Sequence, residues 1–205
     1  MSILNFVRKH LGIPMKFEID AFVEKYCQGN GLEIGGAAYQ EYNIKALNLD
    51  ISKHDDENDV YRIEQIKRCG KVKQVDIVAS GDNIPVAENS FDFVFSSHVL
   101  EHFYNPLSAL REWKRVVKNN GYIVAIVPSK NKTFDRKRKC TTIEEFYQRD
   151  KDYDKSISYQ EAHHTVWLLK TFKSFAKEFE YELVDYINYP SGMKNSFIVA
   201  IRVKK

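Results

Sequence analysis

The chain has 205 residues, of which 43% are hydrophobic and 29% are charged, the composition of one soluble globular domain with its own core. No run approaches the ~20 consecutive apolar residues that cross a bilayer, and no secretory signal is expected at the N-terminus. The three cysteines lie far apart, which argues against a disulfide framework or a zinc knuckle. We therefore expect a cytoplasmic protein without stable membrane insertion.

The net charge of +3 is concentrated in one segment. Residues 130–139 hold six basic side chains and one acid, which leaves the rest of the chain slightly acidic. A nucleic-acid-binding protein spreads basic charge over a whole face. We therefore expect no nucleic-acid partner, and interpret the segment as a local contact for an anionic group. The alternative is a solvated loop.

Short apolar runs alternate with helical patterns along the chain. Two helical patterns come first, at 3–11 and 17–26. Pro106 suits the first turn of a helix at 106–118, in which apolar residues recur every three or four positions. A second amphipathic helix is predicted at 165–179. The runs that predict strands are 32–34, 46–49, 75–79, 91–95, 122–127, 182–189 and 196–203.

This alternation predicts an α/β fold with a doubly wound, mostly parallel sheet. The last two strands are joined by a short connection that begins with residues 190–192 (Pro-Ser-Gly), which indicates a C-terminal antiparallel hairpin. We expect a single domain over 1–205, with an N-terminal helical segment at 1–28. Residues 129–164 are long, charged and weakly periodic, and are interpreted as an insertion that forms a lid over an acceptor site.

Two features at the ends of the first strands suggest a nucleotide-like ligand. Residues 35–38 (Gly-Gly-Ala-Ala) follow the first strand, where small residues let the backbone approach a ligand closely. The dinucleotide fingerprint GxGxxG is absent. Asp50 ends the second strand, where doubly wound sheets bind ribose hydroxyls. The alternative for Asp50 is a helix cap or turn residue.

Three later motifs, in order, carry a family resemblance. They are residues 81–85 (Gly-Asp-Asn-Ile-Pro), 90–92 (Ser-Phe-Asp) and 118–121 (Lys-Asn-Asn-Gly) before a strand that ends in Pro128. With the first two features, they resemble the S-adenosylmethionine (SAM)-dependent methyltransferases of the "type 11" group over residues 29–128. The resemblance implies a Rossmann-like methyltransferase fold of class I with SAM as cofactor. Residues 97–103, 112–116 and 133–138 further resemble a bacterial subgroup associated with surface-polysaccharide assembly.

The resemblance implies roles for individual residues. The methionine end of SAM would lie against Glu33, Gly35 and Gly36, the ribose against Asp50, and the adenine against Asp82 and Asn83; Ile51 and Ser97 complete the expected contacts. Two glycines of the family motif are replaced by Ala37 and Tyr39. The short interval between Gly35 and Asp50 predicts a stunted first helix.

The histidines are the candidate catalytic residues. His98 follows the fourth strand and is a candidate general base or substrate contact, against a structural role. Residues 98–102 match the HxxEH pattern of inverted zinc metalloproteases. Because the pattern lies inside the methyltransferase motif, we interpret it as part of the fold and expect no metal. His163 and His164 are further candidate bases, with solvated loop histidines as the alternative.

The sequence therefore predicts a SAM-dependent methyltransferase for a small-molecule or glycan-type acceptor, with a hydroxyl oxygen as the expected nucleophile. Arg136 and Arg138 are expected to contact an anionic acceptor. Two other classes remain open. The altered first motif is compatible with a non-catalytic binding module of the same fold, and a nucleotide-cofactor oxidoreductase is the weaker alternative because it lacks its fingerprint.

Overall fold

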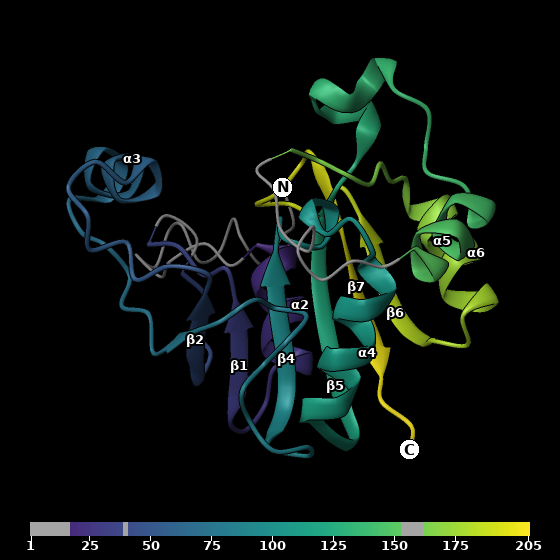
Figure 1. Ribbon diagram of the computed structural model, residues 1–205, viewed down its shortest axis with the longest axis horizontal. Coiled ribbons are helices and arrows are strands. Elements are labelled where there is room, and N and C mark those ends of the chain that lie inside the picture. The colour runs from purple at the N-terminus through teal and green to yellow at the C-terminus, as the bar shows by residue number, and fades with distance from the viewer. Residues whose placement is uncertain (1–16, 39–40, 153–161) are drawn as a thin grey trace, which may run out of the picture.

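The computed structural model describes residues 17–38, 41–152 and 162–205, which form one seven-stranded sheet with helices on both faces (Figure 1). The predicted helix at 3–11 lies outside the described residues. The strand order is β3-β2-β1-β4-β5-β7-β6. The strands are β1 (Gly31–Ile34), β2 (Ala46–Asp50), β3 (Ile77–Val78), β4 (Phe91–Ser97), β5 (Val117–Pro128), β6 (Glu182–Asn188) and β7 (Ser196–Arg202).

The first five strands are parallel, and β7 runs antiparallel to both β5 and β6. The mostly parallel sheet and the C-terminal hairpin are thus confirmed. The order reverses at β1, because β2 continues the sheet on one side and β4 on the other. Doubly wound sheets bind ligands at such a switch point, beyond the carboxyl ends of the strands.

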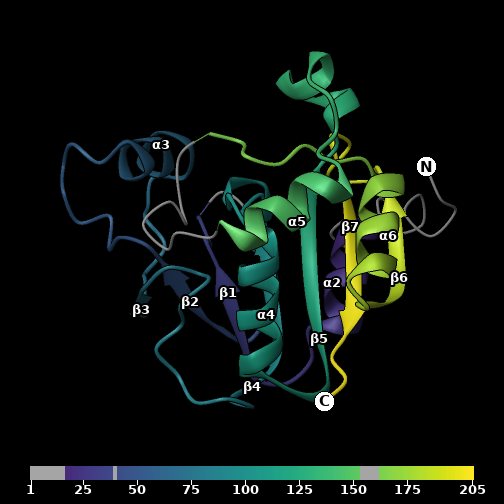
Figure 2. The ribbon, with the colours of Figure 1, turned by 45° about the vertical axis from the view of Figure 1, so that its right-hand side comes forward.

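Both faces of the central strands are buried, which explains their nearly continuous apolar runs. On one face, α2 (Glu18–Tyr26) packs Phe22 and Val23 against Phe93 and Phe95 of β4. The intervening Val94 belongs to the core of the other face. That face is covered by α4 (Pro106–Val116), α5 (Ile143–Lys151) and α6 (Leu169–Glu178), as the turned view shows (Figure 2).

Local chemistry sets the ends of α4. Asn105 caps the helix by accepting a hydrogen bond from the backbone N–H of Leu107, and Pro106 occupies the first turn. The helix ends two residues earlier than predicted because Val117 already pairs with Phe91 in the sheet.

One connection agrees with the predicted pattern, and two other places differ from it. Between β1 and β2, the described residues 35–38 and 41–45 contain no helix, which agrees with the short interval. The helix α3 (Val60–Cys69) follows β2 instead. Residues 165–168, predicted as helix, are extended, because Ser129 forms a β-bridge to the buried Trp167.

The described residues of the insertion at 129–164 form two parts. The 3-10 helices η2 (Lys130–Lys132) and η3 (Phe134–Lys137) extend beyond the carboxyl ends of the parallel strands (Figure 1). The helix α5 packs into the core, where the ring of Phe146 stacks on that of Trp167 with the ring centroids 5.0 Å apart. The described parts of the insertion therefore lie in different places, and its role as a lid stays a prediction. Among the described helices, none has the length and apolar character needed to cross a membrane.

Candidate functional site

A cavity of about 610 Å³ opens at the carboxyl ends of β1, β2 and β4, where the strand order reverses. Its volume suits a cofactor or small substrate. Of the predicted site residues, the lining contains Glu33, Gly35, Gly36, Asp50, Ile51, Ser97 and His98. It does not contain Asp82, Asn83, His163 or His164.

The turn after β1 is held in a fixed shape. Gly35 has φ +67°, and a Cβ atom there would lie 2.6 Å from Val99, so glycine fits where a side chain would clash. The amide of Asn48 clamps Gly36: its Oδ1 accepts from the Gly36 N–H at 3.1 Å, and its Nδ2 donates to the Gly36 carbonyl at 3.2 Å. The backbone is therefore positioned before any ligand binds.

Glu33 contributes a buried carboxylate to the same turn. Lys73 Nζ donates to its Oε2 at 2.6 Å. Burial raises the pKa of Glu33, and the ammonium of Lys73 opposes that shift. The pair keeps a charged group at the cavity wall at limited desolvation cost.

Asp50 belongs to a chain of three titratable residues. Its Oδ1 accepts from the Ile51 N–H at 2.7 Å, and its Oδ2 lies 3.4 Å from His54 Nε2. His54 Nδ1 lies 2.8 Å from Asp59 Oδ2. Asp59 also caps α3 through the Arg62 N–H. The strand end, the following turn and the first turn of α3 are thereby tied together.

His54 is the cofactor-side residue that sequence reasoning missed. It is buried, has φ +54° and lines the cavity. Burial opposes its charged form, yet Asp59 and Asp50 together raise its pKa. Burial in turn raises the pKa of Asp50, against the attraction of His54. The surrounding segment is acidic, but nothing in its spacing indicates that the turn folds back onto Asp50.

Asp82 lies in the turn after β3. Its carboxylate accepts hydrogen bonds from the hydroxyl of Ser80 and from that of Ser108 in α4, the latter at 3.4 Å. Ser80 and Gly81 line the cavity, and Asp82 and Asn83 follow them directly, outside the lining. The adenine contacts expected at Asp82 and Asn83 stay a prediction.

His98 stands at the end of β4 with φ +57°. Its Nε2 lies 2.7 Å from Ser196 Oγ, and that hydroxyl donates to Asn195 Oδ1 at 3.1 Å. The serine proton is thus committed, so His98 Nε2 is the donor and Nδ1 carries the lone pair. Burial, with His163 and His102 nearby, lowers the pKa of His98 to about 4.

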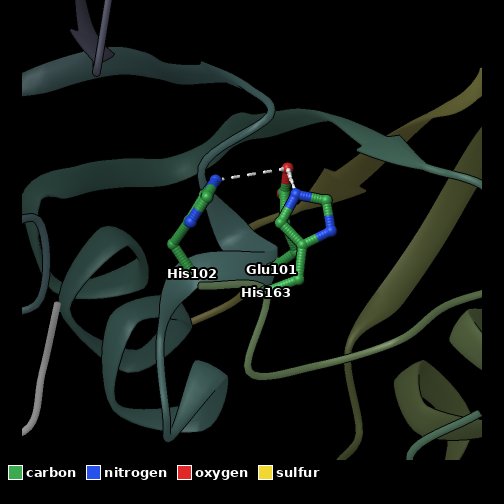
Figure 3. A group of neighbouring side chains, drawn as sticks. All are labelled: Glu101, His102 and His163. Atoms are coloured by element: carbon green, nitrogen blue, oxygen red, sulfur yellow. Dashed lines mark ion pairs between the residues drawn. The ribbon is translucent and has the colours of Figure 1, made fainter. Parts of the chain in front are cut away.

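Glu101 gathers histidines around a buried carboxylate (Figure 3). It follows His98 in the 3-10 helix η1 (Leu100–His102). Its Oε1 lies 3.8 Å from a ring nitrogen of His98, His102 and His163. Burial raises the pKa of Glu101 to about 8. The structure thus brings His98 and His163 to one point, although they are far apart in the sequence.

His164 and the basic segment lie apart from this cluster. The ring centroids of His164 and Tyr104 lie 5.9 Å apart. Burial is the main cause that lowers the pKa of His164, and the positive charge of Arg149 adds to it. Arg136 and Arg138 are both exposed. Arg138 pairs with Asp135 at 2.7 Å, and Asp135 in turn contacts His163. The basic segment is therefore linked to the histidine cluster through Asp135.

Comparisons with known proteins agree with this architecture. Residues 28–125 match the family model described as "Methyltransferase domain". An uncharacterized protein of Methanocaldococcus jannaschii is 31% identical over 202 residues, covering 94% of this chain and 90% of that protein.

Solved structures share the fold at low identity. A SAM-dependent methyltransferase from Aquifex aeolicus has a TM-score of 0.52 at 19% identity, covering 97% of this chain and 98% of that one. A SAM-dependent methyltransferase from Methanosarcina mazei also has a TM-score of 0.52, at 15% identity, covering 89% and 97%.

The residues of the cavity fit SAM. The carboxylate of Asp50 suits ribose hydroxyls, and the backbone at Gly35 and Gly36 allows close approach. Ile51 is 47% exposed beside Asp50 and offers an apolar surface for an aromatic base. The cavity and the family match together place the chain among the class I SAM-dependent methyltransferases, with SAM as its cofactor.

Proposed function

We propose that the protein transfers the methyl group of SAM to a hydroxyl oxygen of a small-molecule or glycan-type acceptor. The observation that carries this proposal is the imidazole of His98, which lines the cavity and keeps a lone pair on Nδ1. A hydroxyl must lose its proton as its oxygen attacks, and an imidazole in reach contributes typically ~10²–10⁴-fold.

The proposed division of labour follows the two sides of the cavity. SAM supplies an electrophilic methyl group on a sulfonium, so the protein mainly aligns the reactants. Glu33, Gly35 and Gly36 hold the methionine end, and Asp50 holds the ribose. His98 accepts the proton of the acceptor hydroxyl, while the electron pair of the breaking carbon–sulfur bond stays on sulfur.

The acceptor is proposed to carry an anionic group. Arg136 and Arg138 are exposed beyond the carboxyl ends of the strands, and guanidinium groups bind carboxylate or phosphate in a bidentate way. An anionic glycan precursor matches this charge, and also the resemblance to enzymes of surface-polysaccharide assembly. The three free thiols, Cys27, Cys69 and Cys140, are compatible with the cytoplasm as its location.

Mass spectrometry of candidate acceptors after incubation with isotopically labelled SAM tests the proposal. We expect label on a hydroxyl oxygen of an anionic sugar or related small molecule. SAM binding by calorimetry without transfer to any acceptor would favour a non-catalytic binding module. Label on nitrogen or carbon would contradict the proposed oxygen nucleophile.

A further inference from the structure

The most unusual polar group in the described structure is the carboxylate of Glu101. The side chain is completely buried, and neither oxygen accepts a hydrogen bond from another described residue. Buried carboxylates are normally paired or hydrogen-bonded, because an unpartnered one costs considerable free energy. The chain therefore places a strong acceptor in the interior and leaves its lone pairs for something else.

The surrounding imidazoles do not satisfy Glu101 by hydrogen bonding. Oε1 lies 3.8 Å from Nε2 of both His102 and His163, beyond the ~2.7–3.2 Å of an N–H···O bond. Figure 3 shows both rings directed at this one oxygen from different sides. One ligand atom from each of the three residues lies within 4.8 Å of the others.

The tautomer of His163 is set by a carboxylate on its other side. His163 Nδ1 lies 2.7 Å from Asp135 Oδ2, and only an N–H satisfies that contact with a carboxylate. In the neutral ring, Nε2 then carries a lone pair that faces the lone pairs of Glu101. Two acceptors that face each other in the interior need a proton or a metal ion between them, and 3.8 Å is too long for a shared proton. A carboxylate behind a histidine is also the usual support of a metal-binding imidazole.

The backbone fixes these side chains in place. The carbonyl oxygen of Glu101 accepts from the N–H groups of His164 and Thr165, at 2.8 and 3.1 Å. These two hydrogen bonds hold the segment that carries His163 against Glu101, the residue that the His163 ring faces. Asp135 is held by Arg138 at 2.7 Å. A metal site requires ligands that are held in position before the ion binds, and neighbouring residues that hold those ligands.

We propose that Glu101, His102 and His163 bind a divalent transition-metal ion of the zinc type, with Asp135 orienting His163. Ligand atoms at ~2.0–2.2 Å from a tetrahedral zinc are about 3.4 Å apart, so the observed 3.8 Å separations close with a small movement. Two imidazoles and one carboxylate leave a coordination position open, as in catalytic zinc sites. His102 also lines the cofactor cavity, so the site borders it.

This proposal reverses the expectation of no metal. That expectation considered only the HxxEH pattern, in which His98 and His102 would be the paired ligands. In the structure, His98 Nδ1 also lies 3.8 Å from Glu101 Oε1, but the ligand atoms that lie within 4.8 Å of one another belong to Glu101, His102 and His163. The site is independent of the proposed acceptor, because its test measures metal binding alone.

Metal binding by the full-length protein is the direct test. The protein is stripped with a chelator, then titrated with Zn²⁺ by calorimetry and with Co²⁺ by absorption spectroscopy. We expect one ion per chain, and a cobalt spectrum of nitrogen and oxygen ligands without a thiolate charge-transfer band. That band would reveal binding at the exposed Cys69 instead and would count against the site. A folded, stripped protein that takes up neither ion would overturn the proposal.

Variants locate the site. Glu101→Gln and His163→Ala are expected to weaken zinc binding by about 100-fold or more, and Asp135→Asn by roughly 10–100-fold. His164→Ala is the matched control, since it removes the adjacent imidazole outside the cluster, and should bind zinc within twofold of the wild type. Equal affinities for His163→Ala and His164→Ala would overturn the assignment. If His163→Ala fails to fold, the comparison of zinc affinity between the wild type and Glu101→Gln, which conserves the side-chain shape, decides whether the site exists.

Discussion

The two sides of the cavity treat their charged groups in opposite ways. On the β1–β2 side, Glu33 is paired with Lys73, and Asp50 and Asp59 hold His54 between them. Each of these carboxylates has a partner inside the protein. A polar network satisfied in this way is rigid and gives a binding surface that exists before the ligand arrives.

On the side of β4 and η1, the carboxylate of Glu101 has no such partner among the described residues. Glu101 is buried without a hydrogen bond from another described residue, and His102 and His163 face it at 3.8 Å. The nearby Arg136 is exposed. The fold thus satisfies the charged groups on one side of the cavity with its own side chains (the finished side) and leaves Glu101 on the other side to a bound ion or ligand (the unfinished side).

His98→Gln tests the unfinished side through catalysis. We expect kcat for methyl transfer to fall by ~10²–10⁴-fold, because the proposed proton acceptor is lost. SAM affinity measured by calorimetry should change by only a few fold, since the proposed cofactor contacts lie mainly on the other side. An unchanged kcat would remove His98 from the proposed mechanism, and a parallel loss of SAM binding would assign it to the cofactor.

Asp50→Ala tests the finished side. A hydrogen bond to a charged group is worth about 1.5–3 kcal/mol, so SAM affinity should fall roughly ten- to a hundredfold. Asp56→Ala is the matched control, because Asp56 is an exposed acid of the same segment outside the cavity lining. Both proteins are titrated with SAM by calorimetry. Equal affinities would rule out Asp50 as the ribose ligand.

Arg136→Gln together with Arg138→Gln tests the link between the basic segment and the acceptor. Exposed charge contacts are worth ~0.2–1 kcal/mol each, so the acceptor KM should rise several fold, and less at high salt. Lys137→Gln with Lys139→Gln removes the same charge from the same segment and serves as control. An equal rise in KM for both pairs would indicate a diffuse charge effect, and an unchanged KM would leave the segment a solvated loop.

Sequence reasoning reached the finished side more fully than the unfinished one. Gly35, Asp50 and the strand order follow from local patterns, because each strand end carries its own residues to the switch point. Asp82 accepts a hydrogen bond from Ser108 of α4, a residue that no motif connects with it. Tertiary contacts of this kind have no period or spacing that a sequence displays.

The cluster at Glu101 shows the same limit more clearly. Its members come from η1 and from the segment before α6, and Asp135 comes from η3. The pattern at 98–102 contains two residues of the proposed metal site, Glu101 and His102, together with His98. His163 is brought to the same point by tertiary contacts, among them its own contact with Asp135 and the hydrogen bonds from the His164 and Thr165 N–H groups to the Glu101 carbonyl.

His54→Asn carries the smallest expected effect and tests whether the finished side stabilises the fold by itself. Asn tolerates the left-handed backbone at this position and removes the titrating ring. The pKa of His54 is raised in the folded protein above its ordinary value of 6.5. The stabilisation from its charged form is therefore complete below about pH 6.5, and is lost as the pH rises through the folded-state pKa. Urea unfolding at a series of pH values should show the wild type more stable than the variant by about 1 kcal/mol at pH 5.5, with the difference shrinking toward pH 9. A difference that is constant or grows with pH would mean that Asp50 and Asp59 do not hold a protonated His54, and the contrast between the two sides of the cavity would lose its cofactor-side half.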